Sequence, residues 1–127
     1  NMYRQQHGCP ALTFNQLLTN AAQGHAVDMA THDFVGHTGS DGSSPWDRME
    51  RAGYQWSAAA ENAAAGYSSP ESVVDGWYNE VPPNDGHRLN MLNCGLQDIG
   101  VGYYYLANDT GAVNYHHYWV QLFGTPR

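Results

Sequence analysis

Two histidines and two glutamates are the residues of this chain best suited to chemistry: His37, Glu61, Glu80 and His87. Charged residues make up only 13% of the sequence, against roughly a quarter in an ordinary soluble domain. Glu61 stands in Ala-Ala-Ala-Glu-Asn-Ala-Ala-Ala, and a carboxylate buried among such neighbours needs a partner. Imidazoles are suitable partners, either directly or through a shared metal ion or water molecule.

The two histidines lie in segments of different kinds. His37 falls in Gly-His-Thr-Gly-Ser-Asp-Gly, a loop too rich in glycine for a helix or strand, and functional side chains concentrate on such loops. His87 falls in the first turn of an expected helix, where the helix dipole favours the neutral imidazole, the form that binds metal. The alternative is that His37 is an exposed loop residue and His87 an ordinary residue at a helix start.

The two glutamates also differ in their settings. Glu80 ends an expected helix, just before Val-Pro-Pro-Asn. A carboxylate there opposes the helix dipole, so either another group compensates for its charge or the side chain is solvated. Glu61 has no such local explanation, which makes it the least expected of the four.

Other histidines offer rival sites. His25, Asp28 and His32 share one face of an expected helix, where they could hold a metal, although a helix edge with satisfied polar groups is commoner. His116 and His117 are neighbours in an expected strand and so point to opposite faces. The chain has no His-Glu-x-x-His, phosphate loop, Gly-x-Gly-x-x-Gly or Gly-x-Ser-x-Gly motif.

Aromatic residues in the last third of the chain could form a platform for a sugar or an apolar ligand. Strand alternation divides them between two faces, so we expect at least half of them to belong to the core. They are Tyr103, Tyr104, Tyr105, Tyr115, Tyr118 and Trp119.

Composition excludes several classes of partner. The 127 residues carry a formal charge of −7, and all five basic residues are arginines. This balance argues against binding to nucleic acid or to anionic membrane surfaces. No apolar run is long enough for a membrane span. The length suits a single domain over residues 1–127. The start Asn-Met-Tyr indicates a trimmed or mature piece, in which any signal peptide would no longer be seen.

Cys9 and Cys94 are the only cysteines. If they pair, they close a loop over most of the chain, a constraint of about 4–5 kcal/mol in the loop-entropy model, and they indicate an oxidising compartment. The alternative is two unrelated buried thiols.

Four helices are expected, each opened by a capping residue. Capping boxes, proline at the first helical position and glycine after the last turn are typical of such boundaries. The helices are 13–32, opened by Thr13-Phe-Asn-Gln; 44–53, opened by Ser-Pro-Trp-Asp; 69–80, opened by Ser-Pro-Glu; and 85–92, capped by Asp85.

The pattern then changes to one of strands. Segments 99–106 and 115–123 are rich in β-branched and aromatic residues and flank the turn Asn-Asp-Thr-Gly, which predicts a β-hairpin. Residues 60–67 are expected to form a further strand. Because helices precede the hairpin without strand–helix alternation, the fold class is α+β rather than a doubly wound sheet.

Together these motifs resemble the CAP superfamily, which contains the cysteine-rich secretory proteins, antigen 5 and the pathogenesis-related group one proteins. The form Gly-His-Arg-x-Asn-x-Leu, with Arg48 upstream, is similar to its bacterial branch. The matching segments are Ala60-Glu-Asn-Ala-Ala-Ala-Gly66, Trp77, Gly86-His-Arg-Leu-Asn-Met-Leu92, Ile99-Gly-Val-Gly102 and Tyr118-Trp-Val-Gln-Leu-Phe-Gly124.

The resemblance implies a three-layer α–β–α sandwich, a protein exported from the cell or to the periplasm, and a central cleft. Carried over by position, the cleft residues are His37, Glu61, Glu80 and His87. His37 and His87 would bind zinc or another divalent cation, and the two acids would contact metal-bound water.

Three functions are compatible with such a cleft. The first is a secreted, metal-holding binding protein whose target is a small molecule, a lipid or a protein. The second is a metal-assisted, peptidase-like hydrolase, although no motif specifies an oxyanion donor or substrate pocket. The third is a metal-independent carrier of lipid or glycan, in which the four residues only stabilise one another.

Overall fold

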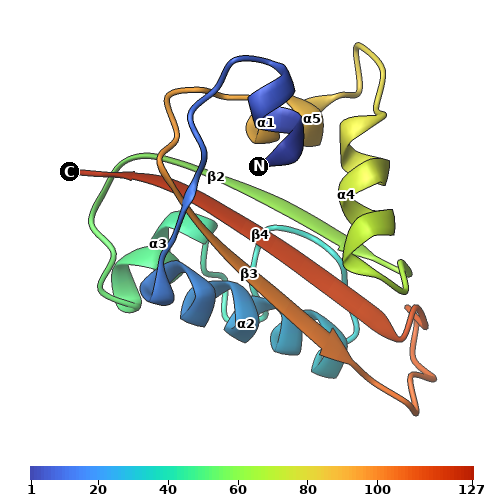
Figure 1. Ribbon diagram of the computed structural model, residues 1–127. Helices are drawn as coiled ribbons and strands as arrows, with labels where there is room; N and C mark the ends of the chain where they lie inside the picture. Colours follow the sequence, from blue (N-terminus) through green and yellow to red (C-terminus); the bar gives the residue numbers. More distant parts are fainter.

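The computed structural model describes all residues from Asn1 to Arg127 and contains one four-stranded sheet. Strands β1 (Thr13–Phe14), β2 (Trp56–Ala65), β3 (Asp98–Tyr105) and β4 (His117–Pro126) lie in the order β1-β3-β4-β2. β4 pairs antiparallel with both β3 and β2, and β1 pairs parallel with β3 (Figure 1). The expected hairpin is therefore present as β3 and β4, and the expected third strand extends over residues 56–65.

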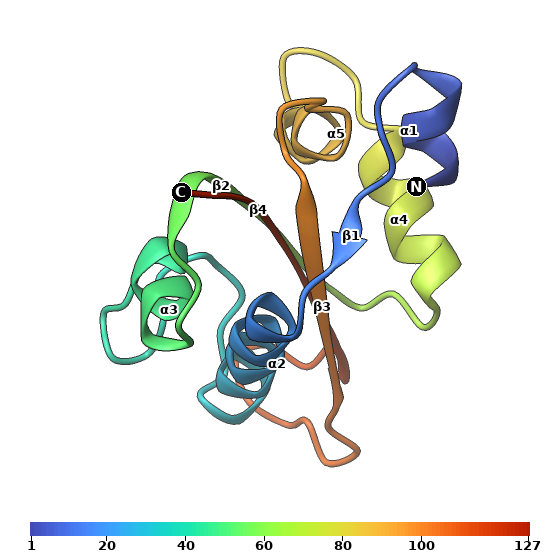
Figure 2. The ribbon, with the colours of Figure 1, turned by 60° about the vertical axis from the view of Figure 1, so that its left-hand side comes forward.

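Helices cover both faces of this sheet. α2 (Gln16–Thr31) and α3 (Pro45–Arg51) lie on one side, and α1 (Met2–Gln6), α4 (Pro70–Tyr78) and α5 (Gly86–Met91) lie on the other (Figure 2). The predicted α+β class and three-layer α–β–α sandwich are confirmed. No helix combines the length and the apolar character that crossing a membrane requires.

The central strand β4 joins the two layers of core. Its side chains alternate between the faces. Tyr118, Val120 and Leu122 pack in the cluster beneath α2, whereas Trp119 and Phe123 pack in the cluster beneath α4 and α5. Because both faces of β4 are covered, it is buried nearly throughout. β2 is held in the sheet by its pairing with this buried strand.

Two of the expected aromatic platform residues are thus core residues, and Tyr104 packs at the edge of the same core. The other three, Tyr103, Tyr105 and Tyr115, are exposed. The expectation that at least half of the six belong to the core is confirmed.

Glycine allows α2 to lie directly on β3. A Cβ added at Gly100 would come within 2.2 Å of the backbone nitrogen of Thr19, and one at Gly102 would come within 2.4 Å of the backbone of Ala22. These are contacts with backbone, which no side-chain rotation relieves. The pair Gly-Val-Gly in β3 therefore sets the distance between the helix and the sheet.

The helix starts are mostly where the sequence predicts them. Ser44 and Ser69 open α3 and α4 through capping boxes. The expected capping box at Thr13 is wrong: Thr13 lies in β1, and the side chain of Asn15 caps α2 by accepting from the Leu18 backbone. α4 ends at Tyr78, so Glu80 follows the helix rather than ending it.

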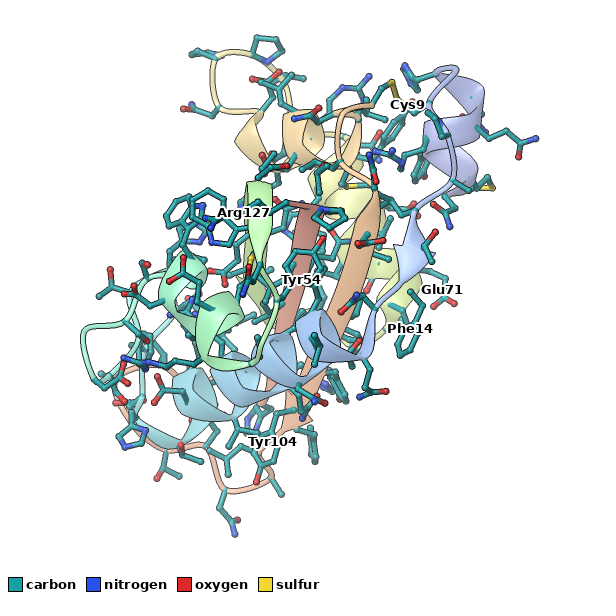
Figure 3. All side chains as sticks on the ribbon, turned by 90° about the vertical axis from the view of Figure 1, so that its left-hand side faces the viewer. Cys9, Phe14, Tyr54, Glu71, Tyr104 and Arg127 are labelled. Carbon is teal, nitrogen blue, oxygen red and sulfur yellow. A yellow bond between two sulfur atoms is a disulfide. The ribbon has the colours of Figure 1, made fainter.

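The sequence does not predict the N-terminal helix α1. This helix is fixed to the layer of the sandwich that contains α4 and α5. Cys9 and Cys94 form a disulfide (Figure 3). The buried guanidinium of Arg4 donates to the carbonyls of Met91, Asn93 and Leu96. These carbonyls lie in and after the last turn of α5, where a cation is favourable. The N-terminus therefore holds α5 in place.

Candidate functional site

Glu61 lies on the edge strand β2, and its side chain is almost fully buried, with 1% exposed. His37 Nδ1 donates to Oε1 over 2.8 Å, and Arg48 Nη2 donates to Oε2 over 2.9 Å. The partners that the sequence required for this carboxylate are therefore an imidazole and a guanidinium, one on each oxygen.

Arg48 also positions the loop that carries His37. Its Nη2 donates to the His37 carbonyl and its Nη1 to the Ser43 carbonyl, both over 2.8 Å. The loop folds closely around the guanidinium, because a Cβ at Gly39 would lie 3.3 Å from Nη1 of Arg48. The hydrogen bond to Glu61 raises the pKa of His37, and partial burial opposes this effect.

Glu80 forms the second acid–imidazole pair. Its Oε2 accepts from His87 Nδ1 over 2.7 Å, and its Oε1 accepts from the backbone N–H groups of His87 at 3.1 Å and Arg88 at 3.4 Å. The carboxylate thus lies at the start of α5, where the dipole favours a negative charge. This is the compensation that a Glu following α4 needs.

Two asparagines connect these pairs through the backbone. Asn90 Nδ2 donates to the Glu61 carbonyl at 3.3 Å and to Asn62 Oδ1 at 2.9 Å. Asn62 Nδ2 in turn donates to the His87 carbonyl at 3.1 Å. The position of α5 against β2, and with it that of His87 relative to Glu61, is therefore fixed by a network of amide hydrogen bonds.

The four predicted residues line one open cavity of about 460 Å³, together with Asn90. Within it they form two separate pairs, His37 with Glu61 and His87 with Glu80. In both pairs the carboxylate contacts Nδ1, and Nε2 of the imidazole makes no hydrogen bond with the protein. Each Nε2 is therefore free to accept a proton or bind an electrophile.

A third histidine lies behind Glu61. His25 is fully buried, donates from Nε2 to the Gly36 carbonyl over 2.7 Å, and lies 3.9 Å from Glu61 Oε1. Burial lowers the pKa of His25, although the nearby Glu61 opposes this. His25 is thus a neutral donor that supports the loop carrying His37, and its buried Nδ1 has no partner.

The rival cluster on α2 does not form a site. Asp28 pairs with the exposed His32 at 2.8 Å and accepts from the backbone and hydroxyl of Ser40, whereas His25 faces the core. The helix-edge interpretation therefore holds for this face. Nowhere in the chain do three or more His, Cys, Asp and Glu side chains have the arrangement of a metal site.

The sequence does not predict the contacts that Arg48, His25 and Asn90 make in this site. A signal existed for Arg48, since only five basic residues are present and a buried Glu61 needs a cation. Nothing local distinguishes His25, because its role depends on a contact with a loop eleven residues away.

Comparison with known proteins gives the family of this chain. Residues 1–123 match the CAP family, described as the cysteine-rich secretory protein family. The uncharacterized protein YkwD of Bacillus subtilis is 36% identical over 103 residues, which are 81% of this chain and 38% of that protein. The uncharacterized membrane protein YlbC of the same organism is 32% identical over 111 residues, 85% of this chain and 31% of that protein.

Solved structures share the fold. An extracellular protein containing an SCP domain from Bacillus anthracis is 28% identical, with a TM-score of 0.81 over 98% of this chain and 37% of that one. An outer surface protein from Borrelia burgdorferi is 21% identical, with a TM-score of 0.83 over 99% of this chain and 86% of that one. The chain thus spans little more than a third of YkwD and of the Bacillus anthracis protein. It belongs to the CAP, or cysteine-rich secretory protein, family.

Proposed function

We propose that this domain is an exported binding protein whose cleft holds a divalent cation, zinc or a similar metal, between His37 and His87. The observation that carries the proposal is the repeated use of Nδ1: each cleft imidazole donates this nitrogen to a carboxylate and leaves Nε2 free. Histidines that bind metals almost always donate their other nitrogen in this way.

His37 and His87 would supply two protein ligands to such an ion. Neutral imidazole nitrogen is a good ligand for zinc, and Glu61 and Glu80 would orient the rings. Since no third His, Cys, Asp or Glu completes a metal site, water or a bound partner would take the other positions. A bound cation would supply a Lewis acid to whatever ligand enters the cleft.

Two further observations support export. The Cys9–Cys94 disulfide suits an oxidising compartment. One relative of the same fold is described as an extracellular protein.

The test is a zinc titration of protein first freed of metal with a chelator. Calorimetry would measure the affinity, and thermal unfolding would measure the stability gained. A ligand at a hundred times its dissociation constant adds about 2.7 kcal/mol to the free energy of unfolding. We expect this gain in the native protein and its loss in His37→Ala and in His87→Ala. Glu61→Gln should weaken zinc binding by roughly 10- to 100-fold.

His32→Ala is the matched control, because His32 is exposed and also pairs with a carboxylate, but at the end of α2 and outside the cavity. It should bind zinc as the native protein does. Zinc binding that survives both cleft variants, or no binding by the native protein at micromolar to millimolar zinc, would rule out the proposal.

A further inference from the structure

β2 is an edge strand that lies beside the cleft. It pairs only with β4, at the margin of the sheet (Figure 2). Gly66 donates its N–H to the His117 carbonyl of β4, and in an antiparallel ladder residues two apart face the same way. The backbone groups of Ala60, Asn62 and Ala64 therefore face β4, and those of Ala59, Glu61 and Ala63 face outward.

Five of these six outward groups have no partner within the protein. They are the N–H and carbonyl groups of Ala59 and Ala63 and the N–H of Glu61, since the Glu61 carbonyl accepts from Asn90. Edge strands usually block such groups with Lys, Pro or an inward charge. A register shift between Trp56 and Ala58 and the inward-pointing charge of Glu61 flank this part of the edge. Ala59 and Ala60 between them carry no such block, so the edge remains able to pair there.

A groove of about 350 Å³ runs along the same groups. Ala59 and Ala60 line it from β2, and Trp46, a residue that is 43% exposed, lines it from α3. The groove also includes His37 and Glu61, which it shares with the cavity of the two acid–imidazole pairs. A ligand along β2 would therefore enter the cleft at one end.

From these features we infer that the groove binds an extended peptide, which pairs with the main chain of Ala59 and Glu61 and places an apolar side chain on Trp46. Such strand addition takes its affinity from main-chain hydrogen bonds and its specificity from pockets for alternate side chains. The peptide would be cationic, because the protein carries a charge of −7 without any lysine and Arg48 is already paired with Glu61.

Peptide binding here does not depend on the proposed metal, so the test is run in a chelator. The probe is a mixture of end-blocked hexapeptides with one fixed lysine and Val, Thr, Ile or Tyr elsewhere. Amide hydrogen exchange, followed by NMR, should slow at Ala59 and Glu61 by about tenfold when nine-tenths of the protein is bound. The amides of Ala60 and Asn62 already bond to β4 and should change little.

Two variants separate pairing from packing. Ala59→Pro removes one outward N–H without breaking the ladder to β4 and should abolish peptide binding, and Trp46→Ala should weaken it at least about tenfold, the equivalent of 1.4 kcal/mol. Ala63→Pro is the control, since its N–H also faces outward but Ala63 lies outside the groove; binding should persist.

Three outcomes would overturn the inference. The first is no change at Ala59 and Glu61 with millimolar lysine peptides. The second is equal binding of a glutamate-containing peptide mixture. The third is protection by chitohexaose instead of peptide, which would make the groove a glycan site. Because all arms contain chelator, a failed zinc titration leaves each of these results unaffected.

Discussion

At the scale of single residues, the two cleft acids are held by different means. Glu61 is buried and has a fixed cation, Arg48, at 2.9 Å. Arg48 supplies a permanent positive charge to this carboxylate, so His37 can act there as a neutral donor. Glu80 instead accepts two backbone N–H groups at the start of α5. In both cases a group other than the imidazole stabilises the negative charge of the acid, which leaves Nε2 of the imidazole free for a ligand.

A residue outside the cleft gives a prediction about pH. Tyr118 is fully buried and its hydroxyl donates to Asp109. Burial, with that hydrogen bond, raises the pKa of Tyr118 from 10.0 to about 12. Because the unfolded chain ionises first, the stabilisation is complete below pH 10 and is lost as the pH rises through 12. Urea unfolding should show that the free energy of unfolding falls as the pH rises from 10 to about 12.

Tyr118→Phe should be less stable near neutral pH and should lose less stability over that alkaline range. Tyr105→Phe, at an exposed position, should follow the native curve. A native curve that stays flat up to pH 12 would contradict the assigned role of Tyr118.

At the scale of elements, the contact between α2 and β3 gives the second prediction. A Cβ at Gly102 would lie 2.4 Å from the backbone of Ala22, so Gly102→Ala must push α2 away from the sheet. Overpacking of this kind costs about 1–3 kcal/mol. Denaturant unfolding should show a loss near the upper end, because no flexible side chain can yield.

Gly24→Ala is the matched control for this change. Gly24 is an exposed residue inside α2 with nothing within 4 Å of an added Cβ. Replacing glycine by alanine in a helix interior gains about 1 kcal/mol. If Gly102→Ala proves as stable as Gly24→Ala, the helix and sheet are farther apart than described.

The elements that sequence predicted well are those with local causes. Ser44 and Ser69 each cap a helix through contacts three residues away. Contacts this close in the chain can be predicted from the neighbouring residues. Thr13 was misassigned because its partner, Asp98 in β3, is distant in the chain. Asn15 then provides the cap, and asparagine is the better capping residue. The sequence does not predict α1 because distant contacts hold it, among them those of Arg4 and the stacking of Tyr3 on Tyr78.

The same distinction applies to the site. His37, Glu61, Glu80 and His87 were identified by unusual neighbours and by family resemblance, and the structure places all four around one cavity. Their pairing was only partly predictable. Glu61 was expected to meet an imidazole, but the choice of Arg48 as its cation and the capping of α5 by Glu80 depend on how α3 and α5 approach β2.

At the scale of the whole molecule, the disulfide joins the segment after α1 to the segment after α5, the helix that carries His87. Cys9 and Cys94 are separated by 85 residues, so their bond restricts most of the unfolded chain. The loop-entropy model assigns about 4–5 kcal/mol to a loop of this length. Cys9→Ser/Cys94→Ser should lower the free energy of unfolding by up to this amount, as measured by urea unfolding without reductant.

The double variant should nevertheless fold, because Arg4 still donates to the carbonyls of Met91, Asn93 and Leu96. Adding Arg4→Ala removes these buried bonds and leaves the carbonyls unpaired, which costs about 1–3 kcal/mol for each group left unsatisfied. We expect the triple variant to lose the fixed position of α5, seen as fast amide exchange over residues 86–91, while the β3–β4 ladder stays protected.

Equal stability of native and double-variant protein would mean that the two thiols do not pair in solution. Simultaneous loss of protection in α5 and in β4 would mean that the two core layers unfold as one unit.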